Sequence, residues 1–444
     1  MQRNPRRPRL VPALAALPLA LAAALVGQDA QASAFQLKEN SVQGLGRAFA
    51  GETSAPGDCA VVVNNPAAMS ELGDGNCAQA DFNIINFETK FKGGGNDFLG
   101  RPLTGGNGGD GGVTKPVPAT FFTHRLNQDW VVGAAIYAPF GFETEYKDTW
   151  VGRYEALKSK LQSIDLTFSA SYKLSDSLSV GASFIVQNTS AELTQAIDFG
   201  TILATPTGGA LLPQEADGFG SLKGNDWGYG FGLGALWKPT DSDRIGINFH
   251  SQIDHTIDGD GKFKVPVNLR PLLGTAFTNS GGKADFDTPW FVNASWWHTV
   301  NDRLSVGANL GFTHWSSFKQ LVVDYDNPAQ PNSVSEFKWD DSWFYSIGGD
   351  YRLNDRLTLR AGVAFDETPT IDATRTPRVP DGDRTWGSIG LGYQVNDQLR
   401  IDAAFLHIWV DDGKVDHEAA TFSTLKGKFT SKGNVLSVSG QYRF

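Results

Sequence analysis

The segment Trp227-Gly228-Tyr229-Gly230-Phe231-Gly232-Leu233-Gly234-Ala235 indicates which secondary structure this chain forms. Every second residue from Trp227 to Ala235 is apolar, and the residues between them are glycines. Successive side chains of a β-strand point to opposite faces of the sheet. An alternation with a period of two therefore predicts a strand with one apolar face and one small or polar face.

Other segments repeat this alternation. From Ile164 to Leu174 the even positions are apolar, and the odd positions carry Asp, Thr, Ser and Lys. Such runs exceed the roughly five or six residues of most sandwich strands. Strands of about ten residues, apolar outside and polar inside, suit a closed membrane barrel, because in hydrocarbon every backbone group must pair within the sheet. Helical membrane spans are excluded, since no later stretch approaches 18 consecutive apolar residues.

Short and long connections alternate along the chain. Val300-Asn301-Asp302-Arg303-Leu304 is a short polar turn between apolar residues, and Leu353 to Leu357 and Val395 to Leu399 repeat it. The long polar connections lie near residues 93–114, 147–161, 196–223, 259–285, 319–337, 369–382 and 412–432. Counting the strands between connections gives 14, so we expect an all-β, 14-stranded antiparallel transmembrane β-barrel over residues 79–444.

The N-terminal region predicts export. Four arginines precede an apolar run from Leu10 to Val26, and Ala30-Gln31-Ala32 is a small-residue cleavage site. Residues 1–32 are therefore interpreted as a signal peptide, since the alternative, a membrane anchor, is interrupted by Pro12 and Pro18. Cleavage removes four Arg and one Asp, which lowers the formal charge from −10 to −13. An exported acidic protein is not expected to bind nucleic acid.

Residues 33–78 lack the alternation of the strands. A barrel of this size encloses an open lumen, and we expect this segment to fill it as an N-terminal hatch, or plug. Cys59 and Cys77 lie in this segment of a protein exported to an oxidising compartment, so they either form a disulfide or remain as two buried thiols.

The third predicted strand, residues 129–146, contains a break. Pro139 has no N–H for the ladder and Gly141 is typical of bulges, so Ala138-Pro139-Phe140-Gly141 interrupts the wall. The interruption is either a harmless bulge at the outer rim or an opening backed by protein or by a cavity.

Two long outer loops are unusually apolar. An exposed apolar patch suggests a binding surface, although these residues could also pack the two loops together. The leucines and phenylalanine concerned are Leu211, Leu212, Leu269, Leu272, Leu273 and Phe277.

Several motifs resemble those of the FadL family of long-chain fatty acid transporters, which includes the TodX-type aromatic hydrocarbon channels. They are Ser33 to Leu37, Gly44 to Ala48, Asn65-Pro66-Ala67, Ala138 to Tyr146, Leu222 to Gly230, Trp315 to Phe318, and Arg375 to Trp386. The resemblance covers nearly the whole mature chain and implies 14 strands, an N-terminal hatch and a hydrophobic passage.

The resemblance also implies roles for particular residues. It places Phe35 beside the ligand and makes Asn65, Pro66 and Ala67 part of a hatch that shifts to open the path. The two apolar loops correspond to the family's first ligand groove. Gly141 takes the position of a kink glycine, so that Pro139, Phe140 and Gly141 form a lateral opening into the bilayer.

We therefore expect passive uptake of hydrophobic compounds, foremost long-chain fatty acids, across the outer membrane of a Gram-negative bacterium. The alternatives are an aromatic hydrocarbon channel of the same family and, in a different class, an outer-membrane enzyme acting on lipids. A fatty acid needs a partner for its carboxylate, whereas a hydrocarbon needs only an apolar pocket. Lys173, Arg360 and Arg400 face inward but could equally pair with lumen carboxylates.

The expected partners are a hydrophobic small molecule and outer-membrane lipids, and we expect a monomer. The seven His and two Cys show no metal-binding spacing, and no nucleotide motif is present, so we expect neither a metal nor a cofactor.

Overall fold

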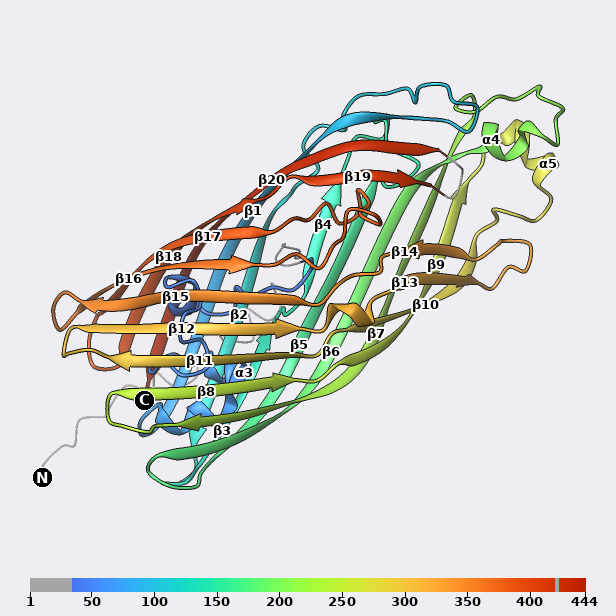
Figure 1. The fold of residues 1–444 in the computed structure, drawn as a ribbon. Helices are drawn as coiled ribbons and strands as arrows, with labels where there is room; N and C mark the ends of the chain where they lie inside the picture. The colour runs from blue at the N-terminus through green and yellow to red at the C-terminus, as the bar shows by residue number, and fades with distance from the viewer. Residues whose placement is uncertain (1–33, 420–422) are drawn as a thin grey trace, which may run out of the picture.

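The strands of the protein form one closed antiparallel sheet, as the computed structural model shows over residues 34–419 and 423–444 (Figure 1). The predicted signal peptide, residues 1–32, lies outside the described residues. Within these ranges the sheet has 20 strand segments, and six wall strands consist of two consecutive segments, so the barrel has the expected 14 strands. It closes because β1 pairs with β2 on one side and with β20 on the other.

The first seven wall strands are β1 (Asn76–Asn96), β2 (Thr114–Arg125), β3 (Trp130–Tyr137) with β4 (Gly141–Glu145), β5 (Lys158–Lys173), β6 (Leu178–Asp198), β7 (Asp217–Trp237), and β8 (Asp243–His250) with β9 (Ile253–Lys264). The other seven are β10 (Ser280–Thr288) with β11 (Phe291–Thr299), β12 (Leu304–Thr313) with β13 (Gln320–Tyr325), β14 (Ser333–Glu336) with β15 (Ser342–Arg352), β16 (Leu357–Asp366), β17 (Arg384–Gln394), β18 (Leu399–Val410) with β19 (Gly413–Glu418), and β20 (Thr424–Arg443).

The alternation of the sequence separates the two faces of the wall. On β7 the side chains of Trp227, Tyr229 and Phe231 are exposed on the outer surface, with Trp227 58% exposed. The glycines between them leave room on the inner face for other parts of the chain. The outer surface is therefore the apolar face, as a barrel surrounded by lipid requires.

The short turns lie at the end of the barrel that holds the C-terminus (Figure 1). In four of them the side-chain oxygen of an asparagine accepts from the N–H groups of the second and third residues that follow it. This asparagine turn closes a ladder locally, which explains why one short sequence recurs. The asparagines are Asn127, Asn301, Asn354 and Asn396.

The long connections are shorter than predicted because the strands continue into them. The predicted loops 196–223 and 259–285 contain strand at 217–223, 259–264 and 280–285, and β7 pairs with β9 there, as in Lys223 with Asp260. Beyond the hydrocarbon the outer face meets water, so the apolar alternation ends while backbone pairing continues.

The N-terminal residues 34–75 lie inside the barrel, as the blue ribbon in Figure 1 shows. They contain α2 (Val42–Leu45), α3 (Val61–Asn64) and η2 (Pro66–Glu71). The outer loops contain α4 (Phe199–Ala204), η3 (Val267–Leu269) and α5 (Arg270–Leu273), and η4 (Trp315–Ser317) follows β12. None of the helices in the described ranges is long and apolar enough to cross a membrane.

Candidate functional site

Phe35 lies at the centre of an aromatic cluster inside the barrel. Its ring centroid is 4.5 Å from that of Trp315 and 5.2 Å from that of Trp339, and further rings surround it at 5.5 to 6.2 Å. Trp315 is fully buried. After β12 the chain turns inward as η4 and takes this indole away from the lipid face.

An apolar cavity, part of it open to solvent, lies against this cluster. Phe35 and Phe142 line it on one side, and the side chains of Lys160 and Arg378 are its cations. Its other walls include Leu161, Leu193, Ile257, Phe286, Phe318, Leu321, Phe337 and Val379. Of the residues that the sequence assigned to the ligand, only Phe35 lines this cavity.

Arg378 is a half-buried cation whose hydrogen-bond partners are neutral. Its guanidinium donates to Ser159 Oγ at 3.2 Å and to Gln195 Oε1 at 2.6 Å. Within the described part of the chain it forms no ion pair shorter than 4.0 Å. Burial lowers the pKa of Arg378 to about 10, and Glu155 opposes that shift. The side chain therefore remains charged at neutral pH and can bind an anion in an otherwise apolar space.

The three cations considered from sequence lie elsewhere. Arg360 Nη1 is 2.7 Å from Asp402 Oδ1, and Arg400 Nε is 3.0 Å from Asp402 Oδ2, so both are paired lumen charges. Lys173 pairs with Asp176 in the short turn after β5. Sequence reasoning missed Arg378, although it lies in the recognised motif Arg375 to Trp386, where Pro377 and Pro380 fix the loop on both sides.

The wall is interrupted where the sequence predicted. Residues 138–140 separate β3 from β4, and the register against β5 changes there. Tyr137 is opposite Asp165 but Gly141 is opposite Gln162, so three residues of this strand face two of β5. The break is therefore a bulge with one extra residue.

The N-terminal segment pairs with the broken strand. Gly141 N donates to Phe35 O at 2.7 Å, and Leu37 N donates to Pro139 O at 2.7 Å. The same residue thus contributes its ring to the aromatic cluster and its carbonyl to the gap. Any movement of Phe35 changes both places together.

The neighbouring strand, β2, carries prolines where it faces the gap. β2 pairs with β3 only as far as Thr120 opposite Ile136. Pro118 and Pro116 precede Thr120 by two and four residues, so their nitrogens face the same side, where β3 has ended. Since proline has no N–H, this edge leaves no unpaired donor at either position.

The hatch motif rests on two glycines of the wall. Asn65 Nδ2 donates to Thr53 O at 2.7 Å and to Ala235 O at 3.0 Å. Pro66 lies against Gly181 and Gly234, which are register partners on β6 and β7. A Cβ at Gly234 would lie 2.2 Å from Asn65 Oδ1, so the small face of these strands is the seat of the motif.

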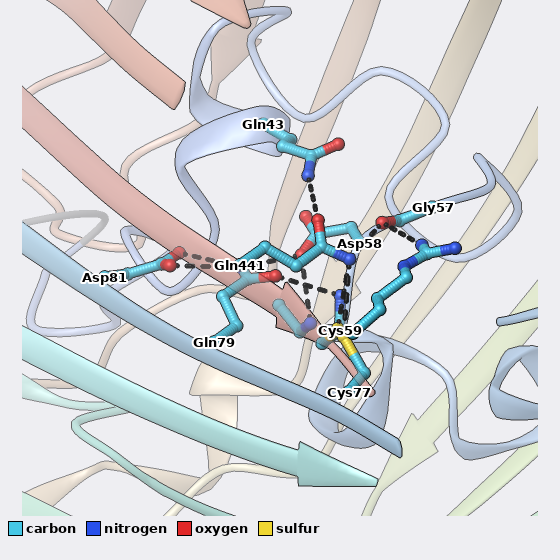
Figure 2. The surroundings of a disulfide bond; sticks show 10 residues. Gln43, Gly57, Asp58, Cys59, Cys77, Gln79, Asp81 and Gln441 are labelled. Carbon is cyan, nitrogen blue, oxygen red and sulfur yellow. Dashed lines mark hydrogen bonds between the residues drawn. A yellow bond between two sulfur atoms is a disulfide. The ribbon is translucent and has the colours of Figure 1, made fainter. Parts of the chain in front are cut away.

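Cys59 and Cys77 are joined by a disulfide (Figure 2). It links the hatch to the beginning of β1, and Gln441 of β20 lies beside it. Gln441 Nε2 donates to Gly57 O at 2.8 Å, and Gln79 Nε2 donates to Asp58 Oδ1 at 2.9 Å. The hatch is therefore attached covalently and by hydrogen bonds near the end of the barrel with the short turns.

The two apolar outer loops pack against each other. The rings of Phe199 and Phe277 are edge to face at 5.0 Å, and Leu269 is buried with them. The remaining leucines, Leu211, Leu212 and Leu273, are half-buried, whereas Leu272 is 57% exposed. One set of side chains thus joins the loops, and Leu272 extends from them into solvent.

Comparison with known proteins gives consistent results. A model of the family described as "Outer membrane protein transport protein (OMPP1/FadL/TodX)" matches residues 23–444. The chain is 31% identical over 436 residues to a 47 kDa outer membrane protein of Pasteurella multocida, covering 96% of this chain and 97% of that protein. It is 29% identical over 409 residues to a long-chain fatty acid transport protein of Escherichia coli, covering 88% and 90%.

Solved structures show the same architecture. The crystal structure of a Pseudomonas aeruginosa FadL homologue has a TM-score of 0.87 and 31% identity to this chain, covering 92% of it and 99% of that chain. The toluene transporter TodX of Pseudomonas putida has a TM-score of 0.67 and 18% identity, covering 90% and 98%, and so shows the fold alone.

Proposed function

Because the chain belongs to the OMPP1/FadL/TodX family of outer membrane transport proteins, we propose that it carries long-chain fatty acids passively across the outer membrane and releases them sideways into the bilayer. Membership confirms the resemblance of the motifs and the location in the outer membrane. It also removes the alternative of a lipid-acting enzyme, since the family consists of transport proteins.

The observation that carries the choice of a fatty acid is Arg378. A hydrocarbon needs only the apolar walls of the cavity, and a guanidinium held there, partly removed from water, would be an unnecessary cost. A carboxylate bound to Arg378, near Lys160, would offset that cost, while the acyl chain packs along Phe35 and the other apolar walls. The relative from Escherichia coli, named as a long-chain fatty acid transport protein, supports the same ligand class.

Lateral release is supported by the double position of Phe35. A ligand that enters the aromatic cluster displaces the ring of Phe35, and the carbonyl of Phe35 then moves away from the N–H of Gly141. We propose that the gap between β2 and β4 then opens toward the membrane, so that an acyl chain enters hydrocarbon without crossing water. Passive diffusion suffices, because the gradient into the bilayer provides the driving force.

Ligand binding to the purified protein in detergent tests the ligand class. We expect a long-chain fatty acid to bind more tightly than the alcohol of the same length. Arg378→Gln should abolish that preference and weaken acid binding by about ten-fold or more, the value of one charge-assisted hydrogen bond. Arg378→Lys should keep part of it, and Arg101→Gln, a paired outer-loop arginine, should change nothing.

Equal binding of acid and alcohol by the unmodified protein would contradict the fatty acid assignment. If toluene bound to the unmodified protein and the acid did not, the second candidate, an aromatic hydrocarbon channel, would replace it.

A further inference from the structure

The outer surface of β1, β20 and β19 carries a row of three lysines. Lys92 of β1 is directly opposite Lys428 of β20, and Lys428 is directly opposite Lys414 of β19. All three side chains are exposed. They share the face of Ile84 and Leu436, which lie lower on the same strands and face lipid, because side chains two residues apart point the same way.

Like charges directly opposite in neighbouring strands destabilise a sheet. Other rows of the same face are balanced, since Lys432 Nζ is 3.3 Å from Glu88 Oε2, and Lys426 Nζ is 2.6 Å from Asp416 Oδ2. In the row of three, Asp412 pairs with Lys428. Within the described residues, Lys92 and Lys414 have no ion pair within 4.0 Å. This row therefore lacks the compensation that its neighbours have.

The position of the row indicates what could compensate it. It lies above the apolar belt, toward the end of the barrel with the long loops, because Lys428 is near the start of β20, Lys92 near the end of β1 and Lys414 at the start of β19. Trp409 of β18 is the register partner of Lys432, and Phe405 is the partner of Leu436, so aromatic and apolar side chains begin just below the lysines. In an outer membrane barrel this level is that of the headgroups of the outer leaflet.

The apolar surface below is hollowed. A groove crosses the outer faces of β11 to β18, with Gly307, Gly348, Gly362 and Gly387 among its lining residues. Ile347 and Ile389 lie beside these glycines, and Phe405 and Trp409 form the end nearest the lysines. The cations lie above, and the apolar groove lies beside and below them. This arrangement matches the charged head and the apolar chains of one amphiphile.

The geometry points to a binding site for a phosphorylated lipid of the outer leaflet, with its phosphate on Lys92, Lys428 and Lys414 and its acyl chains against Trp409 and the groove. Neighbouring strands are about 4.8 Å apart, so the outer two lysines of the row are separated by about 10 Å of sheet. Flexible ammonium groups on that spacing can converge on one phosphate, which has at least two free oxygens.

The test uses the purified mature protein in detergent, with native mass spectrometry to quantify bound lipid. The probes are a phosphorylated glucosamine glycolipid, the same glycolipid without its phosphates, and inorganic phosphate. The unmodified protein should bind the phosphorylated lipid about ten-fold or more tightly than the other two. Lys92→Gln with Lys414→Gln should remove that preference, while Lys428 keeps its partner Asp412.

Lys262→Gln with Lys283→Gln is the matched control. These lysines of β9 and β10 are also exposed, but they pair with Asp260 and Asp258. This control should bind like the unmodified protein. Equal binding of both glycolipids, or undiminished binding by the Lys92 and Lys414 variant, would overturn the proposal. Inorganic phosphate binding as tightly as the phosphorylated lipid would also overturn it, because the site would then not recognise a lipid.

A second measurement separates this site from a folding defect. Without lipid, the Lys92 and Lys414 variant should melt at the same temperature as the unmodified protein or higher, because two repelling charges are gone. The phosphorylated lipid should raise the melting temperature of the unmodified protein only. A lower melting temperature of the lipid-free variant would mean that the lysines stabilise the sheet themselves, against the proposal.

Discussion

A single methyl group at Gly234 tests how the hatch is seated. An added Cβ would lie 2.2 Å from Asn65 Oδ1 and 2.9 Å from Pro66 Cδ, so Gly234→Ala must displace the motif. Overpacking of this kind costs about 1 to 3 kcal/mol. We expect a lower unfolding midpoint in urea and a larger ion conductance in planar bilayers. Gly440→Ala, where a Cβ meets nothing within 4 Å, should leave both unchanged. Identical behaviour of the two variants would mean that the motif does not rest on this wall.

The carboxyl group of Glu39 makes the stability of the hatch depend on pH. Burial raises its pKa from 4.5 to about 7, with the charge of Arg384 opposing that shift. A carboxyl group whose pKa is higher in the folded than in the unfolded protein favours folding while it is protonated. This contribution to the free energy of unfolding is fully present below the unfolded pKa and is lost as the pH rises through the folded pKa. Between pH 4.5 and 7 the loss approaches about 3 kcal/mol.

Comparing the unfolding free energies of the unmodified protein and Glu39→Gln at pH 4 and pH 8 isolates this contribution. The unmodified protein should lose about 3 kcal/mol more than the variant over that range. The same loss in both proteins would show that Glu39 ionises without resistance in the folded state.

At the scale of elements, the outer loops are expected to govern capture. Leu272 extends from the packed loops, and burying methylenes of a ligand against it contributes about 0.8 kcal/mol each. Leu272→Ser with Leu273→Ser should therefore slow fatty acid uptake by cells at low ligand concentration but not at saturation. Val334→Ser, which changes a similarly exposed residue of β14, is the control. Uptake equal to that of the control at every concentration would remove these loops from the capture step.

The barrel itself was predictable because its sequence signals lie in short stretches of the chain. Apolar alternation, as from Trp227 to Ala235, and the repeated asparagine turns each depend on a few neighbouring residues. The extensions of β7 and β9 were missed, since pairing beyond the hydrocarbon leaves no apolar period. The break at Pro139 was visible because a missing N–H and a glycine are local signals.

The candidate site was less predictable because its residues meet only in the closed barrel. Arg378 and Phe35 are far apart in the sequence, and nothing at either position states that both line one cavity. The side chain of Arg360 also points into the barrel, yet it is neutralised by Asp350 of the neighbouring strand β15 and by Asp402 of β18, two strands away. The odd or even position of a residue in its strand determines the face on which its side chain lies. The partners of that side chain depend instead on the register across several strands.

At the scale of the whole molecule, the disulfide holds the hatch to the wall. It closes a segment with a sequence separation of 18 residues, and cross-linking a loop of this length contributes about 3 kcal/mol. Cys59→Ser with Cys77→Ser should lower the unfolding free energy by about that amount and leave the barrel closed. Alkylation of the denatured, unreduced protein provides the direct check. Two reactive thiols in that experiment would show that the bridge does not form.

We propose that the fatty acid leaves the barrel through the wall between β2 and β4. Deleting Pro139 removes the extra residue and lets Tyr137 and Gly141 keep their partners on β5 in one continuous register. Pro139→Ala keeps the extra residue and serves as the matched control. The decisive measurement is the initial rate of uptake of a radiolabelled long-chain fatty acid by cells that express each form at equal levels. We predict that the deletion reduces uptake to that of cells without the protein, although the purified variant still binds the acid, while the control transports normally. Unreduced uptake by the deletion variant, with its third strand shown to be regular, would contradict lateral release.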